Sequence, residues 1–464
     1  MIRLCDFMPL WLSFNTITTR AQRHKENKTT GCLAIIIFLL LMLQQLALAA
    51  DSTDDSNQSN YSYDEIDAHA LAAPASVEAS AESLAAYLIE PATNDREKSR
   101  AIFRWICENI DYDVNVFFTG KAGSTNSTDV LKSRKSICYG YSDLFLDLAK
   151  EAGLEAVRIK GYGKGYGYMP GTNFTGPSNH AWNAVRINGT WCLVDSTWGA
   201  GYVNGDGKYV RRFEDHFFLT PPSQFIYDHF PEEEQWQLLD EPVSKAEFER
   251  LVYLEPDFFR LGLMLGEEKN GTIEAENEVN ISIHAPDDVL MMVALQPAEG
   301  DAGIDGYSFC QREEGRYDLL ARFPAAGRYI LTAYGKKKDD PGEYNSVLKF
   351  LINASSGDEE GAGFPTAFAK FPEAGCYLMS PLVGRLEAGK SYWFSIRVPG
   401  AEDVAVVSGD EWTHLAKQDD LFEGNATAGE EGAGVYASKG GGKWDGVVNY
   451  MLCSLFIQYD FLSI

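Results

Sequence analysis

Ser136-Ile137-Cys138-Tyr139-Gly140-Tyr141 opens the stretch of sequence that decides the fold of this chain. Apolar residues then recur at the helical period, at positions 141, 144, 145, 148 and 149, which predicts a buried helix with Cys138 in its first turn. Unpaired backbone N–H groups and the positive end of the helix dipole favour a thiolate at such a position. The same N–H groups can bind the oxyanion that forms when a thiolate attacks a carbonyl.

A second stretch, from His180 to Asp195, predicts a β-hairpin. Its two apolar runs are joined by Asn188-Gly189, and Asn-Gly between such runs is the strongest short hairpin signal. In this register Ile187 faces Thr190, so Asp195 is the diagonal neighbour of His180 on the same face of the sheet. We therefore expect the two side chains to lie within reach of a hydrogen bond.

Cysteine, histidine and aspartate are the residue types that acyl transfer to a thiol needs. An imidazole can take the proton of the thiol and later give it to the leaving group, while a neighbouring carboxylate fixes the tautomer and stabilises the imidazolium. Each residue also has a structural interpretation, as a small core residue, a satisfied polar group or a turn residue. The helix start and the hairpin register together favour the catalytic interpretation of Cys138, His180 and Asp195.

In these motifs the chain resembles the transglutaminase-like (papain-related) superfamily. The motifs are Cys138-Tyr139-Gly140-Tyr141, His180-Ala181-Trp182-Asn183 and Asp195-Ser196-Thr197-Trp198. Residues 161–168, Trp198-Gly199-Ala200-Gly201 and His229-Phe230-Pro231 are similar to the kyphoscoliosis-peptidase-like branch. The resemblance implies that Cys138 is the nucleophile, His180 the base and Asp195 the orienting acid. Ser136 departs from the family, which usually has glycine two residues before the nucleophile.

The pattern and the resemblance predict an α+β chain, in which a transglutaminase-like (papain-like) cysteine core is followed by two β-sandwich (Ig-like) domains. After Pro256, short apolar alternations separated by Gly and Pro turns are typical of β-sandwiches, and 464 residues suggest about three domains. The expected boundaries are 1–50 for a signal peptide or signal anchor, 51–75 for a flexible spacer, 76–265 for the catalytic domain, 266–354 for one β-sandwich and 364–464 for the second.

The N-terminal segment predicts export. Basic residues precede the eleven apolar residues Leu33 to Leu43, which suit the hydrophobic region of a signal peptide and are short for a membrane span. Cleavage is expected near Ala49 or Ala50, with an uncleaved membrane anchor as the alternative. Nine Asn-x-Ser/Thr sequons after residue 50 also favour a secreted or cell-surface protein.

Composition excludes several classes of partner. The net charge of −27 argues against nucleic acid and anionic membranes. Residues 161–168 lack the glycine spacing of phosphate-binding motifs, and no Cys-x-x-Cys or His-x-x-x-His spacing occurs, so we expect no cofactor and no metal. Of the six cysteines after residue 50, five remain beside Cys138, and an odd number cannot form a complete disulfide framework.

The sequence thus predicts an exported cysteine acyl-transfer enzyme, a transglutaminase-like peptidase or amidase that acts on a peptide or carboxamide carbonyl through a thioester. Its expected partner is a protein or peptide substrate, and the β-sandwiches are expected to bind surface proteins. Two alternatives remain, a cross-linking transglutaminase and a non-catalytic cell-surface scaffolding protein that retains the fold.

The glycine-rich loop 161–171 carries one more hypothesis. Its glycines imply mobility, and Tyr162, Tyr166 and Tyr168 could line the mouth of the cleft, so the loop could gate the substrate. A long surface connection is the alternative interpretation.

Overall fold

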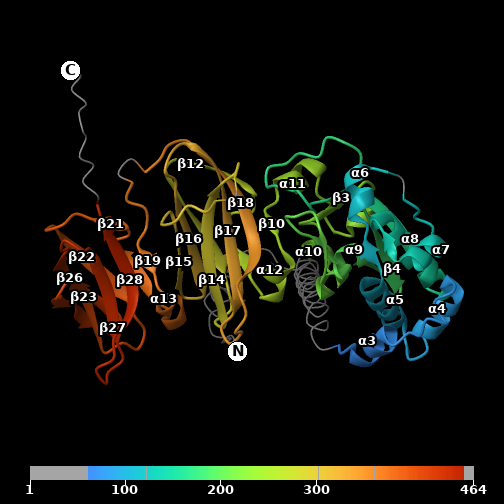
Figure 1. The fold of residues 1–464 in the computed structure, drawn as a ribbon, viewed down its shortest axis with the longest axis horizontal. Helices are drawn as coiled ribbons and strands as arrows, with labels where there is room; N and C mark the ends of the chain where they lie inside the picture. The colour runs from blue at the N-terminus through green and yellow to red at the C-terminus, as the bar shows by residue number, and fades with distance from the viewer. Residues whose placement is uncertain (1–60, 122, 301, 359–360, 454–464) are drawn as a thin grey trace, which may run out of the picture. The chain divides into compact units, whose positions relative to one another are not determined.

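The computed structural model describes residues 61–121, 123–300, 302–358 and 361–453. Within these ranges the chain has an α+β part followed by two β-sandwiches (Figure 1). None of the helices in the described part is long and apolar enough to span a bilayer. The expected signal segment 1–50 lies outside the described residues, so export stays a prediction.

The α+β part is built on a five-stranded antiparallel sheet with the order β8-β5-β4-β3-β9. The strands are β3 (Ala156–Gly163), β4 (His180–Ile187), β5 (Thr190–Val194), β8 (Phe218–Thr220) and β9 (His229–Pro231). Asn188 and Gly189 connect β4 to β5 with φ of 51° and 87°, as the tightest hairpin turn requires. Ile187 pairs with Thr190, so the predicted register is confirmed.

Three long helices support this sheet: α4 (Ala81–Leu88), α5 (Asp95–Asn109) and α8 (Cys138–Glu151). Helix α8 packs against β3 and β4, and α4 and α5 pack against α8 (Figure 1). Asn94 caps α5 by accepting a hydrogen bond of 3.0 Å from the Glu97 N–H, which satisfies one of the unpaired donors of the first turn. Helix α8 begins at Cys138, also as predicted.

Shorter elements connect this framework. They are β1 (Asp111–Tyr112), α6 (Val114–Thr119), α7 (Ser127–Ser133), β2 (Lys135–Ser136), α9 (Ser196–Ala200), β6 (Gly201–Val203), β7 (Tyr209–Arg211), η2 (Asp215–Phe217), α10 (Pro222–Phe225), η3 (Glu234–Gln237), α11 (Lys245–Arg250) and α12 (Pro256–Arg260). Strand β1 pairs in parallel with β2, which places the segment before α6 beside the residues that lead into Cys138.

Helix α3 (Asp64–Leu71) lies in the segment 51–75, for which the sequence predicted a flexible spacer. Asp67 forms an ion pair of 2.7 Å with Arg100, which is 4% exposed in α5. A buried guanidinium requires a paired charge, so the described end of this segment is ordered by a residue that follows it by 33 positions. The composition of residues 51–75 alone does not indicate such a distant partner.

The first β-sandwich begins earlier than the predicted residue 266. Its sheets have the orders β10-β18-β17-β14, with β12 beside β18, and β11-β13-β16-β15. The strands are β10 (Tyr253–Leu254), β11 (Met264–Leu265), β12 (Thr272–Ala275), β13 (Glu278–His284), β14 (Val289–Pro297), β15 (Ser308–Glu313), β16 (Arg316–Arg322), β17 (Gly327–Lys337) and β18 (Asn345–Ala354). Strands β10 and β11 have two residues each, too few to show an alternating pattern.

The second β-sandwich follows the glycine- and glutamate-rich stretch 355–363. Its sheets have the orders β19-β28-β27-β23-β24, with β21 beside β28, and β20-β22-β26-β25. The elements are β19 (Thr366–Ala367), α13 (Lys370–Ala374), β20 (Tyr377–Ser380), β21 (Arg385–Leu386), β22 (Ser391–Arg397), β23 (Asp403–Ser408), β24 (Glu411–His414), β25 (Ala416–Gln418), β26 (Leu421–Thr427), β27 (Ala433–Ser438) and β28 (Asp445–Leu452). Each sandwich has its own apolar core.

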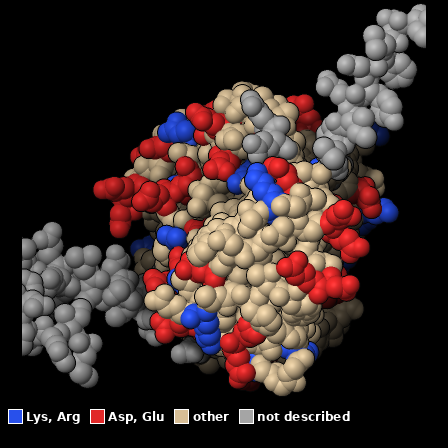
Figure 2. Space-filling view, turned by 90° about the vertical axis from the view of Figure 1, so that its left-hand side faces the viewer, with Lys and Arg blue, Asp and Glu red and all other residues tan. Residues whose placement is uncertain are grey.

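Acidic side chains are spread over the face of the molecule shown in Figure 2, around an uncharged central area. This distribution agrees with the formal net charge of −27. In the described part of the chain no disulfide joins the cysteines, which are at positions 107, 138, 192, 310, 376 and 453.

The start of α8 yields a stability prediction. A Cβ added to Gly140 would lie 2.0 Å from Ser136 Oγ, so Gly140→Ala should lower the free energy of unfolding by about 1–3 kcal/mol through overpacking. Ser136→Gly in the same chain should restore most of that loss. Urea unfolding measures both variants, and an unchanged Gly140→Ala midpoint would show that this contact does not constrain the turn.

Candidate active site

Cys138, His180 and Asp195 meet in the structure, although they come from three separate elements. Cys138 begins α8, His180 begins β4, and Asp195 follows β5 and caps α9. His180 Nε2 lies 2.6 Å from Asp195 Oδ2, and the Cys138 thiol lies close enough to the same imidazole to raise its pKa. The three residues are 4%, 5% and 0% exposed. The predicted juxtaposition is therefore present, while the catalytic roles stay a prediction.

The Asp195 carboxylate is held in one orientation by the backbone. Its Oδ1 accepts hydrogen bonds from the N–H groups of Thr197 (2.8 Å) and Trp198 (3.3 Å), as an N-cap residue does. Burial alone would raise the pKa of Asp195, but the charge and hydrogen bonds of His180 and His229 hold this pKa well below its usual range. The carboxylate is thus ionised at neutral pH and faces His180 with its other oxygen.

His180 lies between the thiol and the carboxylate. Burial alone would lower its pKa, but the charge and hydrogen bond of Asp195, together with Cys138, raise this pKa to about 10. The imidazole therefore holds its proton at neutral pH. A protonated imidazole beside a cysteine is the arrangement that stabilises a thiolate.

A second histidine, for which the sequence motif predicted no role, shares the carboxylate. His229 Nε2 lies 3.1 Å from Asp195 Oδ2, and His229 Nδ1 lies 2.5 Å from Asp228 Oδ1. His229 is 1% exposed and Asp228 is 6% exposed. The site therefore contains a buried row of interacting groups that runs from Cys138 through two histidines to Asp228.

Two glycines of β3 make this row possible. His180 on β4 pairs with Gly161, and His229 on β9 pairs with Gly163, so the two histidines flank β3 on one face of the sheet. A Cβ on Gly163 would lie 3.2 Å from the ring of His180, and one on Gly161 would lie 2.4 Å from the ring of Trp182. Because β3 has no side chains there, both imidazoles reach one carboxylate. This spacing of two glycines before the motif with His229 is the signal that sequence reasoning could have used.

Aromatic rings surround the two imidazoles. The Trp198 ring centroid lies 5.1 Å from that of His180 and 4.3 Å from that of His229, and Phe225 stacks on His229 at 3.9 Å. Such walls lower the local dielectric and strengthen every charge interaction inside them. Asn183 anchors the arrangement, because its Nδ2 donates to the backbone oxygen of Ser142 in α8 at 3.0 Å.

Comparisons with known proteins agree with this geometry. Residues 82–196 match the family model of the transglutaminase-like superfamily, and residues 245–365 match that of the KY-like, immunoglobulin-like domain. The chain joins a transglutaminase-like core to a KY-like, immunoglobulin-like domain. The first matched range contains Cys138, His180 and Asp195, whereas His229 lies between the two ranges.

Several curated proteins are similar in sequence to this transglutaminase-like chain. Kyphoscoliosis peptidase of Homo sapiens is 26% identical in an alignment that covers 75% of this chain and 70% of that protein. Kyphoscoliosis peptidase of Mus musculus is 33% identical over 63% of this chain, and hillarin of Drosophila melanogaster is 34% identical over 62%. The matched regions span 43% of the mouse protein and 39% of hillarin.

An exposed aromatic shelf adjoins the site of the transglutaminase-like core. It consists of Phe117, Phe118 and Tyr166, which are 40%, 52% and 46% exposed and whose ring centroids lie 5.1–6.0 Å apart. Helix α6, which carries the two phenylalanines, buries none of its residues. Tyr112 connects the shelf to the site. Its ring lies 5.7 Å from that of Phe117. The pKa of its phenol is raised, mainly by burial and then by the charges of Cys138 and Asp195.

The glycine-rich loop differs from its prediction. Only Tyr166 of the three tyrosines joins the aromatic shelf, whereas the rings of Tyr162 and Tyr168 pack on Phe174 at 5.4 and 5.9 Å. Lys164 Nζ is buried and donates to the backbone oxygen of Leu251 at 3.0 Å, and burial lowers the pKa of Lys164 to about 7. These contacts attach most of the loop to its surroundings, so they weaken the gating hypothesis.

A metal ion fits the histidines and Asp195 less well than a hydrogen-bonded network does. One ligand atom each of His180, Asp195 and His229 lies within 4.8 Å of the others, but the nitrogen–oxygen distances of 2.6 and 3.1 Å are those of hydrogen bonds. Ligand atoms about 2.1 Å from a tetrahedral ion lie about 3.4 Å from one another. The expectation of no metal stays a prediction.

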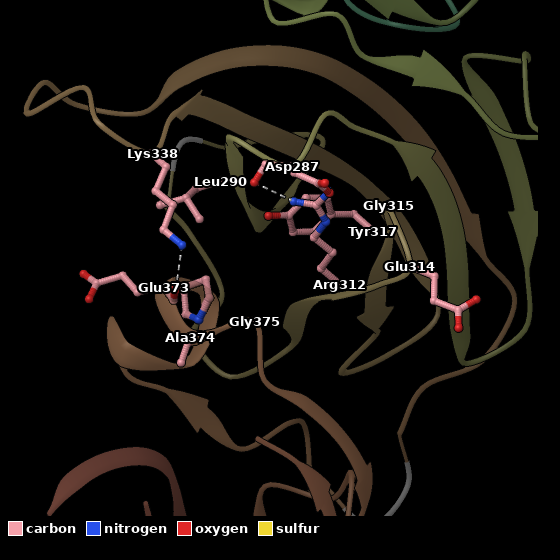
Figure 3. A pocket seen from close by; sticks show the side chains of 11 residues that line it. Asp287, Leu290, Arg312, Glu314, Gly315, Tyr317, Lys338, Glu373, Ala374 and Gly375 are labelled. Atoms are coloured by element: carbon pink, nitrogen blue, oxygen red, sulfur yellow. Dashed lines mark hydrogen bonds and ion pairs between the residues drawn. The ribbon is translucent and has the colours of Figure 1, made fainter. Parts of the chain in front are cut away.

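A pocket elsewhere in the chain does not compete with this site. Figure 3 shows that it is lined by residues of the two sandwiches and that its cations already have partners. Arg312 binds Asp287 at 2.7 Å, and Lys338 donates to the backbone oxygen of Glu373 at 3.1 Å. No cysteine, serine or threonine lies among its lining residues.

The raised pKa of His180 can be measured without any substrate. In carbon-13 NMR of labelled histidine, the His180 imidazolium should persist until about pH 10 and lose its proton above that value. Asp195→Asn removes the charge that raises the pKa, so the midpoint should fall toward about 6.5, the ordinary value. His180→Gln assigns the resonance, and an equal midpoint in wild type and Asp195→Asn would contradict the ion pair.

Proposed function

We propose that this chain is an exported transglutaminase-like cysteine peptidase or amidase, which transfers the acyl group of a peptide or carboxamide to Cys138 and then to water. The observation that supports it most directly is the buried contact of His180 with both Cys138 and Asp195. Together they supply a nucleophile, a proton carrier and an orienting carboxylate in one chain of contacts.

In the first half of the reaction the Cys138 thiolate attacks the carbonyl carbon. A C–S bond forms, the carbonyl electron pair moves to oxygen, and N–H groups at the start of α8 stabilise the oxyanion. When the tetrahedral intermediate collapses, the C–N bond breaks and the leaving nitrogen takes the proton of the His180 imidazolium. The acyl group is then held as a thioester.

In the second half, His180 accepts a proton from water as the water oxygen attacks the thioester carbonyl. The C–S bond breaks, the carboxylic acid leaves, and the thiolate and imidazolium are restored. An amine in place of water would give an amide and therefore a cross-link. We favour hydrolysis because the human relative, 70% of which is covered by the match, is named a peptidase.

The aromatic shelf supports a substrate with an apolar side chain near the reactive carbonyl. Exposed aromatic groups of this kind mark binding surfaces more often than inert ones. The three rings of the shelf carry no charged atoms. Tyr112 links them to Cys138, because its ring packs near that of Phe117 and its phenol interacts electrostatically with Cys138. We therefore infer a polypeptide substrate rather than a small amide.

Export is supported by the apolar segment 33–43 and by the sequons. Of the seven sequon asparagines in the described part, the structure places six on the surface and one at an intermediate position. The exposed residues are Asn126, Asn173, Asn188, Asn270, Asn280 and Asn425. Surface exposure is required for a glycan.

The function is tested by incubation with mixed protein substrates and a labelled amine. Wild type should release fragments, and Cys138→Ala should release none, because the thioester cannot form without its sulfur. Cys192→Ala is the matched control, since Cys192 lies in β5 and, because strand side chains alternate, faces the side of the sheet opposite Asp195. Amine incorporation without fragments would favour cross-linking, and neither product would favour a non-catalytic scaffold.

The substrate preference is tested by Phe118→Ser. Removal of this ring should raise KM about tenfold for a substrate that binds the shelf and leave kcat nearly unchanged. The reason is that the ring stabilises the bound substrate and the transition state equally. Phe368→Ser is the control, since Phe368 is 42% exposed but belongs to the second sandwich. Equal KM values for both variants would exclude the shelf from binding.

A further inference from the structure

One oxygen of Asp195 accepts hydrogen bonds from two histidines. His180 Nε2 lies 2.6 Å and His229 Nε2 lies 3.1 Å from Oδ2. Oδ1 is occupied by the N–H groups of Thr197 and Trp198. Both oxygens of the Asp195 carboxylate therefore have hydrogen-bond donors. Because His180 and His229 share one oxygen, a change in the charge of His229 also changes the electrostatic potential at His180.

Hydrogen-bond chemistry decides the charge of His229. An ionised carboxylate can only accept hydrogen bonds, and both ring nitrogens of His229 face carboxylate oxygens, those of Asp195 and Asp228. With both carboxylates ionised, both nitrogens carry hydrogen, which is the imidazolium form. A cation at this depth needs paired charges, and two carboxylates provide them.

We propose that His229, held as a cation by Asp228, is a positioning residue that fixes the Asp195 carboxylate and offsets part of its charge, so that His180 can release its proton to the leaving group. The inference rests on the proposed function, since it assigns His229 a part in the same reaction. His229 touches no substrate atom and acts only through Asp195.

The physical reason is the electrostatic attraction between the Asp195 carboxylate and the His180 imidazolium. A carboxylate that faced His180 alone would bind the imidazolium proton more tightly, and the imidazolium would be a poorer acid for the leaving nitrogen. A second cation on the same oxygen weakens that attraction while the hydrogen bond to His180 remains. Aromatic rings on both histidines keep water away, so the effect is not screened.

The surrounding charges act on the same network and must stay constant in a test. From other elements, Cys107 and Tyr112 interact electrostatically with Asp195, and Tyr112 also interacts with Cys138. Around Asp228 the corresponding groups are Lys164, His216, Tyr253 and Glu255, and His216 also faces His229. Of these groups only His216 is altered below, and only in the control variant.

Two variants remove the charge but keep a donor toward Asp195. In His229→Gln the amide nitrogen can replace Nε2, and in Asp228→Asn a neutral His229 can still donate from Nε2. Both should raise the His180 midpoint, measured by carbon-13 NMR, by about one pH unit, which corresponds to a tenfold higher proton affinity. Since the wild-type midpoint is expected near pH 10, the scan must extend to about pH 12.

The direction of the shift separates this role from a structural one. A variant that merely loosens the Asp195–His180 contact should lower the midpoint, as is expected for Asp195→Asn, and an unchanged or lowered midpoint in both variants overturns the proposal. His216→Phe is the control, because its ring stacks on Phe259 without contacting Asp195; its midpoint should equal that of wild type.

The measurement needs no turnover, so it stays informative if the chain proves to be a scaffold. In that case the shift would still occur, and only the proposed function would fail. Urea unfolding of each variant shows whether it is folded. If His229→Gln does not fold, Asp228→Asn decides the outcome alone.

Discussion

The buried carboxylate of Asp195 is the constraint on which the α+β part depends. At 0% exposure, an ionised group must have every lone pair satisfied, and four donors provide this. Two are backbone N–H groups at the start of α9, and two are imidazoles from strands on either side of β3. Helix α9, the β4–β5 hairpin and strand β9 are therefore held together through one side chain.

The same constraint explains the glycines and aromatic residues around it. A carboxylate that serves two strands separated by a third requires that the middle strand leave space, and Gly161 and Gly163 do so. Trp198 and Phe225 then cover the imidazoles. Gly161 and Gly163, which the sequence assigned to a flexible loop, thus allow close packing at the site. Lys164 and Tyr168 attach the rest of the loop through contacts with Leu251 and Phe174.

Much of this could be predicted because it follows from local patterns. The helical period after Cys138 and the Asn188-Gly189 turn each determine a short-range geometry, and the hairpin register then places Asp195 beside His180 with no further information. The two sandwiches were likewise visible as alternating strands. Their start was not, because strands β10 and β11 consist of two residues each and are defined only by the strands with which they pair.

The sequence by itself determined the helix that presents Cys138, the hairpin that aligns His180 with Asp195, and the succession of an α+β core and two sandwiches. Only the tertiary structure decided that His229 and Asp228 join the site and that Asp67 orders the segment before the core. The reason is physical. Turns and periodicity depend on neighbours in the chain, whereas a buried charge selects its partners by proximity in space, and those partners lie 34 and 33 positions away.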